Sequence, residues 1–340
     1  MATSRLGGHQ GGRDNQMIDG SGGGYAALVD ALPEGEFAGL ERAVAARKCR
    51  ELVGFGTLDE AAAAFRGRSR CARCGGEVRL DGRTPAGHQR YRCGSCGART
   101  SALTGTIFEG CKKDLATWVE FVRLMRWNVP LDAAAEACGI SHQTAWEWRH
   151  RVFATVDGYQ DRLVLRDRAW IDETYVDDTD LSHGYGQARK RGLSGQKLCI
   201  AVGIDVHKNV VARACGHGKP STKRMKDAML PHLGRGAVVV HDMEKSHIGL
   251  VRAAGCVDEA YRADVTDPVY LECMAMVNNL CSWLKRYLWR FTGMDPANLQ
   301  GYLNWYAYLF RVHQARDRWP ELARVVRHLM MTDARFRSST

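Results

Sequence analysis

The chain has 340 residues, of which 48 are Lys or Arg and 38 are Asp or Glu, giving a formal net charge of +10 at neutral pH. This length allows two or three domains with a substantial core. No apolar run approaches the ~20 residues of a membrane span, and the N-terminus lacks the charged-then-apolar pattern of a signal peptide. The sequence therefore predicts a cytoplasmic protein without membrane association. Its basic excess favours an anionic partner such as nucleic acid.

The N-terminal quarter of the chain separates into two kinds of sequence. Residues 1–24 are rich in Gly, Ser, Gln and Asn without periodicity, which predicts a disordered tail. Residues 25–68 carry helical patterns and are expected to form an N-terminal helical segment. Within this segment Thr57 is positioned as an N-cap, and Glu60 completes a capping box. These two residues predict a helix that starts directly after Thr57.

Two Cys-x-x-Cys pairs form the strongest local motif. They are separated by eighteen residues and consist of Cys71, Cys74, Cys93 and Cys96. This spacing is typical of a structural zinc site on two knuckles, and four thiolates leave no open position for water. The sequence thus predicts a zinc ribbon at residues 69–104 that holds one structural Zn²⁺. A redox dithiol and free core cysteines are the alternatives.

A helix-turn-helix pattern follows at residues 112–157. Residues 131–137 predict a short helix, Gly139 lies in a turn, and Ser141 is placed to cap a helix that runs to about Thr155. A helix, a glycine-containing turn and a second helix are typical of DNA-binding domains. An ordinary helical hairpin is the alternative.

The second helix of this pattern has a polar side directed away from the core. Ala145, Trp148 and Val152 share one face and are expected to pack inward. The candidates for contact with DNA on the more exposed side are His142, Gln143 and Arg149. Gln143 and Arg149 are the best suited of these to read base edges.

An acidic residue stands inside a strand-like run at residues 170–176, Trp-Ile-Asp-Glu-Thr-Tyr-Val. Bulky and β-branched side chains favour a packed strand. An ionised Asp172 buried there costs several kcal/mol unless it is paired or holds a metal. Strand alternation puts Asp172 and Glu173 on opposite faces, so the two are not expected to share a site. A strand that ends in a solvated Asp-Glu pair is the alternative.

Further polar residues follow at positions that suit the same chemistry. The apolar run 236–242 predicts a short strand ending on Asp242, where functional side chains of an open α/β sheet usually lie. Asn278 and Lys285 are seven residues apart in a predicted helix, so they point the same way, about 10 Å apart. Two aspartates on strands, a ligand on a helix and a basic residue are the constellation of two-metal phosphoryl-transfer enzymes. His247 is expected either to orient a ligand or phosphate or to be a structural histidine.

The remaining elements complete this domain, which is expected to span residues 161–315. Residues 197–204 and 209–215 predict two strands joined by a hairpin, and residues 221–230 predict a helix. The order strand, strand, strand, helix, strand, helix is the order that an RNase H-like sheet requires. Residues 316–340 are assigned to a C-terminal extension.

A basic loop separates the first two strands of this domain. It carries Arg189, Lys190 and Arg191. These side chains are expected to contact the DNA backbone near the active site, and a merely solvated basic loop is the alternative.

Together these motifs resemble the DDE-type transposases of bacterial insertion sequences, in particular the group with an N-terminal zinc ribbon and an Asp-Asp-Asn-Lys catalytic set. The resemblance extends from about residue 55 to about residue 312. The matching residues are Asp172-Glu173-Thr174-Tyr175, Arg189-Lys190-Arg191-Gly192, His241-Asp242 with Ser246-His247, Val277-Asn278-Asn279-Leu280-Cys281 with Leu284-Lys285-Arg286, and Leu299-Gln300-Gly301-Tyr302-Leu303-Asn304.

The resemblance implies an α/β catalytic domain with an RNase H-like mixed sheet and flanking helices, preceded by a zinc ribbon and a helix-turn-helix. Two Mg²⁺ ions, or Mn²⁺, would be held by Asp172, Asp242 and Asn278, with Asp172 bridging the ions. Lys285 would contact a phosphate near the cut.

The resemblance also implies a bacterial, nucleoid-associated transposase. Such an enzyme binds double-stranded DNA, at the terminal inverted repeats of its element and at the target, as a homo-oligomer, and catalyses DNA cleavage and strand transfer. One alternative is a zinc-ribbon and helix-turn-helix DNA-binding regulator with an inactive nuclease-like domain. Another is a metal-dependent nuclease without joining activity.

Overall fold

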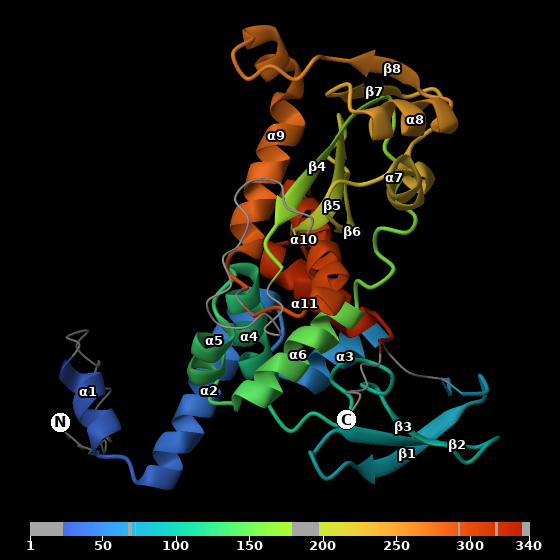
Figure 1. Cartoon of the computed structure of the whole chain (residues 1–340). Coiled ribbons are helices and arrows are strands. Elements are labelled where there is room, and N and C mark those ends of the chain that lie inside the picture. Colours follow the sequence, from blue (N-terminus) through green and yellow to red (C-terminus); the bar gives the residue numbers. More distant parts are fainter. Residues whose placement is uncertain are drawn as a thin grey trace, which may run out of the picture.

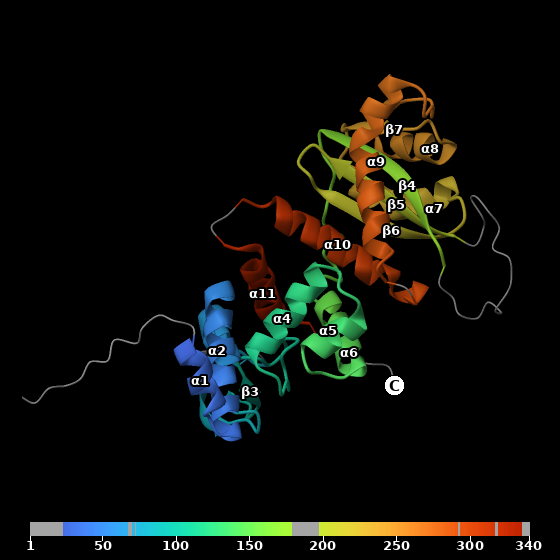
Figure 2. The same ribbon diagram turned by 90° about the vertical axis from the view of Figure 1, so that its left-hand side faces the viewer.

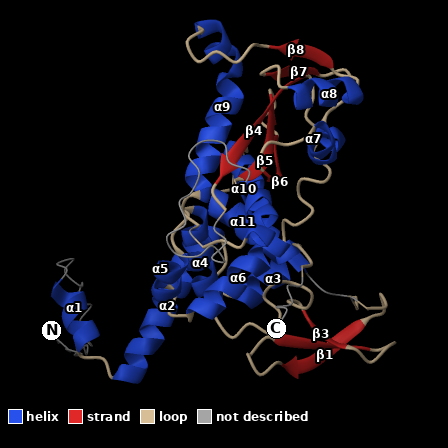
Figure 3. Ribbon diagram, viewed as in Figure 1, coloured by secondary structure: helices blue, strands red, loops and turns tan. Residues whose placement is uncertain are grey.

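The computed structural model describes residues 23–66, 70–71, 73–178, 197–291, 293–316 and 319–334. A five-stranded sheet flanked by helices lies at one end of the molecule, and a helical unit with a small three-stranded sheet lies at the other (Figure 1, Figure 3). No helix in these described ranges is long and apolar enough to span a bilayer.

The larger sheet consists of β4 (Arg168–Val176), β5 (Leu198–Asp205), β6 (Val210–His217), β7 (Val238–His241) and β8 (Val257–Ala260), in the order β6-β5-β4-β7-β8. Strands β6, β5 and β4 pair antiparallel, whereas β4, β7 and β8 pair parallel. A mixed five-stranded sheet of this kind with flanking helices fits an RNase H-like fold. The fold class expected for this part of the chain is therefore confirmed.

Helices cover both faces of this sheet (Figure 1, Figure 2). They are α7 (Thr222–Met229) and α8 (Lys245–Ala254) on one face, and α9 (Pro268–Leu288) and α10 (Leu299–Gln314) on the other, with 3-10 turns at Leu230–His232 and Pro296–Asn298. Because neighbouring strand residues point to opposite faces, Ile171 of β4 packs with the core under α7 and α8, while Trp170 donates from Nε1 to the backbone oxygen of Cys273 in α9 at 2.8 Å. Every residue of β5 is buried, as expected for a strand covered on both faces.

Amide side chains close the outer edge of β6. Gln160 Oε1 accepts from the backbone N–H of Ala212 at 2.7 Å, and Gln300 Oε1 accepts from that of Ala214 at 3.0 Å. Gln160 Nε2 also donates to Asn304 Oδ1 at 2.8 Å. An edge strand otherwise leaves its backbone groups unpaired. The Gln300 to Asn304 motif of α10 is therefore structural, because it fastens this helix to the sheet.

The other end of the molecule is mainly helical. It contains α1 (Gly23–Asp30), α2 (Glu34–Val53), α3 (Leu58–Arg66), α4 (Leu115–Arg126), α5 (Leu131–Ala137) and α6 (His142–Ala154), and a small antiparallel sheet of β1 (Val78–Arg83), β2 (Gln89–Cys93) and β3 (Arg99–Ser101). The predicted cap of α3 is confirmed, because Thr57 Oγ1 accepts from the backbone N–H of Glu60 at 3.1 Å. The predicted cap of α6 is confirmed as well, since Ser141 Oγ accepts from the N–H of Thr144 at 3.1 Å.

Several elements were not expected from the sequence. The region expected only as a C-terminal extension contains α11 (Glu321–Met331), which packs against α2, α3 and α4. Strands β1, β2, β3 and β8 were not predicted either. Strand β8 has little apolar alternation, and it forms because the backbone of β7 offers it a parallel pairing edge. A single apolar core joins Trp118 of α4, Leu284 of α9 and Leu329 of α11.

The packing of α11 predicts a large stability effect at its centre. Leu329 is fully buried, so Leu329→Ala should lower the free energy of unfolding by about 2–5 kcal/mol, because buried apolar surface is removed and a cavity remains. Met331 of the same helix is 50% exposed, and Met331→Ala should change it by less than about 0.5 kcal/mol. Urea unfolding followed by circular dichroism measures both variants. Equal midpoints for the two would contradict the packing of α11.

Candidate active site

Two aspartates meet on adjacent parallel strands of the five-stranded sheet. In the ladder of β4 and β7, Ala169 pairs with Val239 and Trp170 with Val240. Continuing this register puts Asp172 level with Asp242, the first residue after β7. The charge of Asp242 acts on Asp172, where it helps to raise the pKa. The structure therefore brings these two predicted residues together.

Asp172 is a half-buried acid that has no ion-pair partner among the described residues. Burial is the main reason that its pKa rises to about 7, and the charges of Asp242 and Glu173 add to the effect. The backbone N–H of Glu173 donates to Asp172 Oδ1 at 2.8 Å, which partly opposes the rise. His247 pairs with Asp242 and Glu173 instead, and within the described ranges no Lys, Arg or His forms an ion pair with Asp172.

Helix α9 brings the other two predicted residues to this face of the sheet. Cys281 Sγ lies 3.8 Å from Asp172 Oδ2. Asn278 precedes Cys281 by three residues and Lys285 follows it by four, so all three lie along one side of the helix. Asn278 is half-buried, and its side chain forms no hydrogen bond with the described residues. Lys285 is exposed and lines a cavity of about 260 Å³ beyond the end of β4.

A histidine connects Asp242 with Glu173, a residue that was expected to lie outside the site. His247 is fully buried in the first turns of α8; its Nδ1 lies 3.0 Å from Asp242 Oδ1, and its Nε2 lies 2.7 Å from Glu173 Oε2. The expectation that Asp172 and Glu173 do not share a site is therefore wrong in one respect. The two carboxylates do point to opposite faces, but α8 covers the Glu173 face and returns His247 to Asp242 at the strand end.

The charges in this trio support one another. Burial by itself would raise the pKa of Asp242, but the hydrogen bond and the charge of His247 outweigh burial and lower it. Burial would likewise lower the pKa of His247, but its contacts with Asp242 and Glu173 raise that pKa to about 9. At neutral pH His247 is therefore a cation held between two carboxylates, and it fixes the orientation of Asp242.

The oxygens near Asp172 are suited to a divalent metal ion. Asp242 uses Oδ1 to accept from the N–H of Glu244 at 3.1 Å and from His247, while its Oδ2 has no hydrogen bond with the described residues. Hard carboxylate and amide oxygens with free lone pairs are the ligands that Mg²⁺ prefers. Asp172 and Asp242 offer such carboxylate oxygens, and Asn278 offers an amide oxygen on the helix that faces Asp172.

The two histidines beside Asp242 fit a metal less well. His241, Asp242 and His247 offer ligand atoms within 4.8 Å of one another. However, His241 Nδ1 accepts from the N–H of Met243 at 3.3 Å, and its Nε2 lies 3.0 Å from Asp258 Oδ1. Both nitrogens of His247 are also engaged. His247 therefore supports Asp242 and Glu173, whereas His241 pairs with Asp258.

The four cysteines of the small sheet converge as a metal site requires. The sulfurs of Cys71, Cys74, Cys93 and Cys96 lie within 4.8 Å of one another, with Cys71 and Cys96 3.8 Å apart and Cys74 and Cys93 3.5 Å apart. A tetrahedron with Zn–S bonds of about 2.3 Å has edges of roughly 3.8 Å. The donor set therefore fits Zn²⁺.

Glycines and backbone amides shape the loops around these cysteines. Gly75 and Gly97 have φ values of 73° and 68°, which side chains rarely tolerate. The backbone N–H of Arg73 donates to Cys71 Sγ at 3.4 Å, and that of Cys96 donates to Cys93 Sγ at 3.5 Å. These amides stabilise the thiolate form that metal binding needs.

Helix α6 exposes only part of its predicted polar side. His142 and Gln143 are exposed at its N-terminal end, as expected. Arg149 is not: it is 7% exposed, and its guanidinium lies over the ring of Phe291, 5.2 Å from the centroid. The expected exposure of Arg149 is wrong, because α10 and the segment after α9 cover the side of α6 that α4 leaves free. The predicted basic residues Arg189, Lys190 and Arg191 lie outside the described residues.

Comparison with known proteins gives distant structural similarities. A chain of the simian T-cell lymphotropic virus intasome, in complex with PP2A regulatory subunit B56 gamma, matches 46% of this chain and 59% of its own length, with 10% identity and a TM-score of 0.26. A chain of a pre-cleavage Mos1 transpososome matches 64% of this chain and 78% of its own, with 11% identity and a TM-score of 0.21. A chain of the Mos1 mariner paired end complex with Mn matches 56% of this chain and 76% of its own length, with 11% identity and a TM-score of 0.21.

No family model matches the chain, and no curated protein matches it. The solved structures named above are 10 and 11% identical to this chain, so the likeness is distant.

The raised pKa of Asp172 predicts a stability gain on its neutralisation. A carboxyl whose pKa is about 7 when folded and near 3.8 when unfolded destabilises the fold above pH 7 and not below pH 3.8. Asp172→Asn should therefore raise the thermal midpoint by several degrees at pH 8 and by little at pH 4, without divalent ions. Differential scanning calorimetry measures this, with Asp227→Ala, an exposed acid on α7, as the control. A midpoint at pH 8 that stays at the wild-type value would contradict it.

The cysteine geometry predicts one tightly held Zn²⁺ per chain. Cys93→Ser removes one thiolate of the closed set and should lower the zinc content to near zero, with loss of strand signal from β1, β2 and β3. Cys256→Ser, a half-buried cysteine outside the cluster, serves as the control and should retain the metal. Elemental analysis of the purified protein decides the point. Undiminished zinc in Cys93→Ser would refute the assignment.

Proposed function

We propose that this chain is a DNA transposase of an insertion sequence that cleaves DNA and transfers strands by metal-dependent phosphoryl transfer. The observation that carries the proposal is the pair Asp172 and Asp242, both half-buried, which lie level with each other on β4 and directly after the parallel strand β7. A half-buried acid that has no cation as its partner and lies beside a second acid is costly in a purely structural role. It is expected where divalent cations are held for chemistry on phosphates.

Each residue around this pair has a separate role in the proposal. Asp172, Asp242 and Asn278 would hold the two Mg²⁺ or Mn²⁺ ions. Bound ions of this kind activate the attacking water or 3′-hydroxyl and stabilise charge on the phosphate. His247 keeps Asp242 in place, with Glu173 as its second partner. Lys285, on the same side of α9 as Asn278, would contact a phosphate near the cut.

The third ligand distinguishes this site from one with three acids. An amide in place of a carboxylate retains an oxygen ligand but removes one negative charge. The ion on the Asn278 side is therefore expected to bind more weakly and to depend on the phosphates of bound DNA.

The rest of the chain supplies DNA contact in this proposal. The zinc ribbon (residues 69–104) and the helix-turn-helix (residues 112–157) would bind the terminal inverted repeats, with His142 and Gln143 at the exposed start of α6. Arg189, Lys190 and Arg191 would contact the DNA backbone. The formal net charge of +10 supports a polyanionic partner. Because two ends and a target must meet, the active form would be a homo-oligomer on DNA.

A strand-transfer assay tests this function. Purified protein is incubated with Mg²⁺, with DNA that carries the sequences flanking the gene, and with target DNA. Wild type should give joined products, and Asp172→Ala and Asp242→Ala should abolish them while binding to the flanking DNA persists, because neither variant touches the DNA-binding elements. Asp227→Ala, an exposed acid on the opposite face of the sheet, is the control and should retain activity.

The products separate this proposal from its alternatives. Cleavage without joining would overturn the transposase in favour of a metal-dependent nuclease. Specific binding without any cleavage by the wild type would overturn it in favour of a DNA-binding regulator with an inactive domain.

A further inference from the structure

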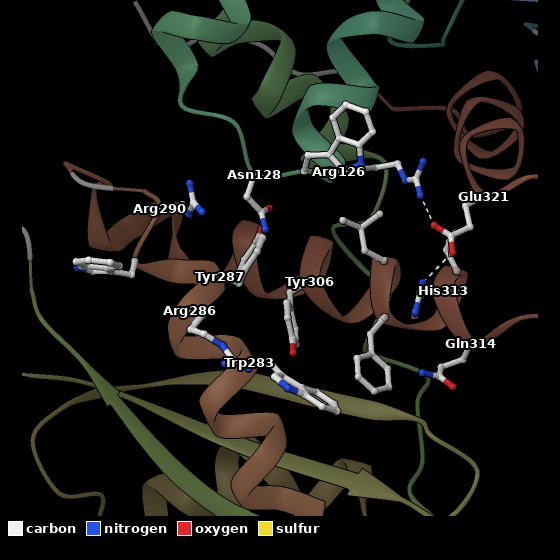
Figure 4. Close-up of a pocket in the computed structure, with 15 residues that line it drawn as sticks. Arg126, Asn128, Trp283, Arg286, Tyr287, Arg290, Tyr306, His313, Gln314 and Glu321 are labelled. Atoms are coloured by element: carbon white, nitrogen blue, oxygen red, sulfur yellow. Dashed lines mark hydrogen bonds and ion pairs between the residues drawn. The ribbon is translucent and has the colours of Figure 1, made fainter. Parts of the chain in front are cut away.

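A second concave surface lies on α9, next to the side that carries Lys285. It is a groove of about 1020 Å³ between the C-terminal end of α4, the C-terminal half of α9 and α10 (Figure 4). The residues that matter most for its chemistry are Trp127, Trp283, Arg286, Trp289, Arg290 and Tyr306. The groove is separate from the carboxylates of the active site.

Aromatic rings form the floor and rim of this groove. Trp283 lies beside Phe310 with ring centroids 6.3 Å apart, and Tyr306 lies 6.3 Å from the same ring. Figure 4 shows Trp283 and Tyr306 between the two ends of the groove. Trp127, Trp283 and Trp289 are 59%, 45% and 81% exposed, respectively. A cluster of exposed large aromatic side chains marks a binding surface more often than an ordinary solvated face.

The charge of the groove is concentrated at one end. At the α11 end, Glu321 pairs with both Arg126 and His313, as the dashed lines in Figure 4 show. At the α9 end, Arg286 and Arg290 form no ion pair within the described part of the chain. Two guanidinium groups are therefore free to meet an anion at the end of the groove that is nearer to Lys285.

Trp289 connects the groove with the cavity that holds Lys285. Its side chain lines both spaces. It follows Lys285 by four residues, so the two lie on the same side of α9. Arg286 lies about 100° further round the helix, and Arg290 follows directly after the C-cap of α9. Lys285 thus lines one of these two adjoining spaces, and Arg286 and Arg290 line the other.

We infer that this groove binds an unpaired DNA strand that leaves the active site past Lys285. This inference rests on the proposed function. The chemistry of the groove matches both parts of such a strand, since guanidinium groups contact phosphates and the aromatic rings stack on bases. Bases in an intact duplex are stacked on one another and cannot reach Trp283. The occupant is thus a single strand or the frayed end of a duplex.

Binding of labelled oligonucleotides tests the inference without any need for catalysis. The probe is a fluorescein-labelled single strand of deoxythymidine about twenty nucleotides long, enough to pass through the groove, and fluorescence anisotropy is measured without added Mg²⁺. Trp283→Ala and Trp289→Ala should each weaken binding about 5- to 150-fold, the range for removal of one stacked base. Trp289→Phe should retain most of the affinity. A duplex of the same length should bind these variants as it binds the wild type.

The arginines are tested by the salt dependence of the same binding. Replacing Arg286 and Arg290 together by Ala should reduce the slope of log affinity against log salt by about 0.7 for each phosphate that the protein no longer neutralises. The matched controls are Arg252→Ala, an exposed arginine on α8, and Tyr25→Ala, an exposed aromatic on α1, and both should behave as wild type. Sedimentation of each variant without DNA monitors the oligomeric state.

Two results would overturn the inference. One is wild-type affinity for the single strand in all groove variants, and the other is a changed oligomeric state with unchanged affinity, which would make the groove a protein interface. Strand-transfer assays on the same proteins keep the two proposals apart. If the wild type joins DNA and the groove variants bind the single strand as well as the wild type does, only the inference about the groove is overturned. If the groove variants lose affinity for the single strand but the wild type neither joins nor cleaves DNA, only the proposed transposase function is overturned.

Discussion

The arrangement of this molecule depends on a half-buried carboxylate, Asp172, that forms no ion pair with the described residues. Asp172 lies on a strand between two neighbours, with Asp242 level on the adjacent parallel strand. Burial and neighbouring negative charge raise its pKa to about 7. The fold bears this free-energy cost in a sheet whose neighbouring strand β5 is buried throughout. A polyvalent cation bound beside Asp172 and Asp242 would remove this cost, in line with the metal-dependent function proposed above.

Helix α9 contacts Asp172, the main core and the aromatic groove. One side faces Asp172 through Cys281, and Leu280 and Leu284 are buried in the main core. The side that remains exposed carries Arg286 and Arg290 into the groove. A single helix therefore fixes the distance between the carboxylates, the lysine beyond β4 and the aromatic surface. On the opposite face of the sheet, α8 has the corresponding role, because it holds His247 between Asp242 and Glu173.

Local pattern was sufficient for most of the elements and for the central pair. Strand alternation around Asp172, the strand end at Asp242 and the seven-residue step from Asn278 to Lys285 each depend on a short stretch of chain, and the structure agrees with these placements. The same reasoning failed for Arg149. From the sequence, a polar helical face is expected to be exposed when no nearby segment covers it. Phe291, about 140 residues further along the chain, covers Arg149 on this face of α6.

The sequence by itself determined the strand around Asp172, the strand end before Asp242, the two Cys-x-x-Cys pairs and the caps of α3 and α6, because each of these depends on spacings of a few residues. Only the tertiary structure decided that Glu173 pairs with His247, that α11 closes the helical core, and that Trp289 lines two cavities. These features depend on contacts between segments distant in the chain. A pattern read along the chain gives the direction of a side chain relative to its own helix or strand. The partner that covers the side chain is set by the packing of the whole molecule.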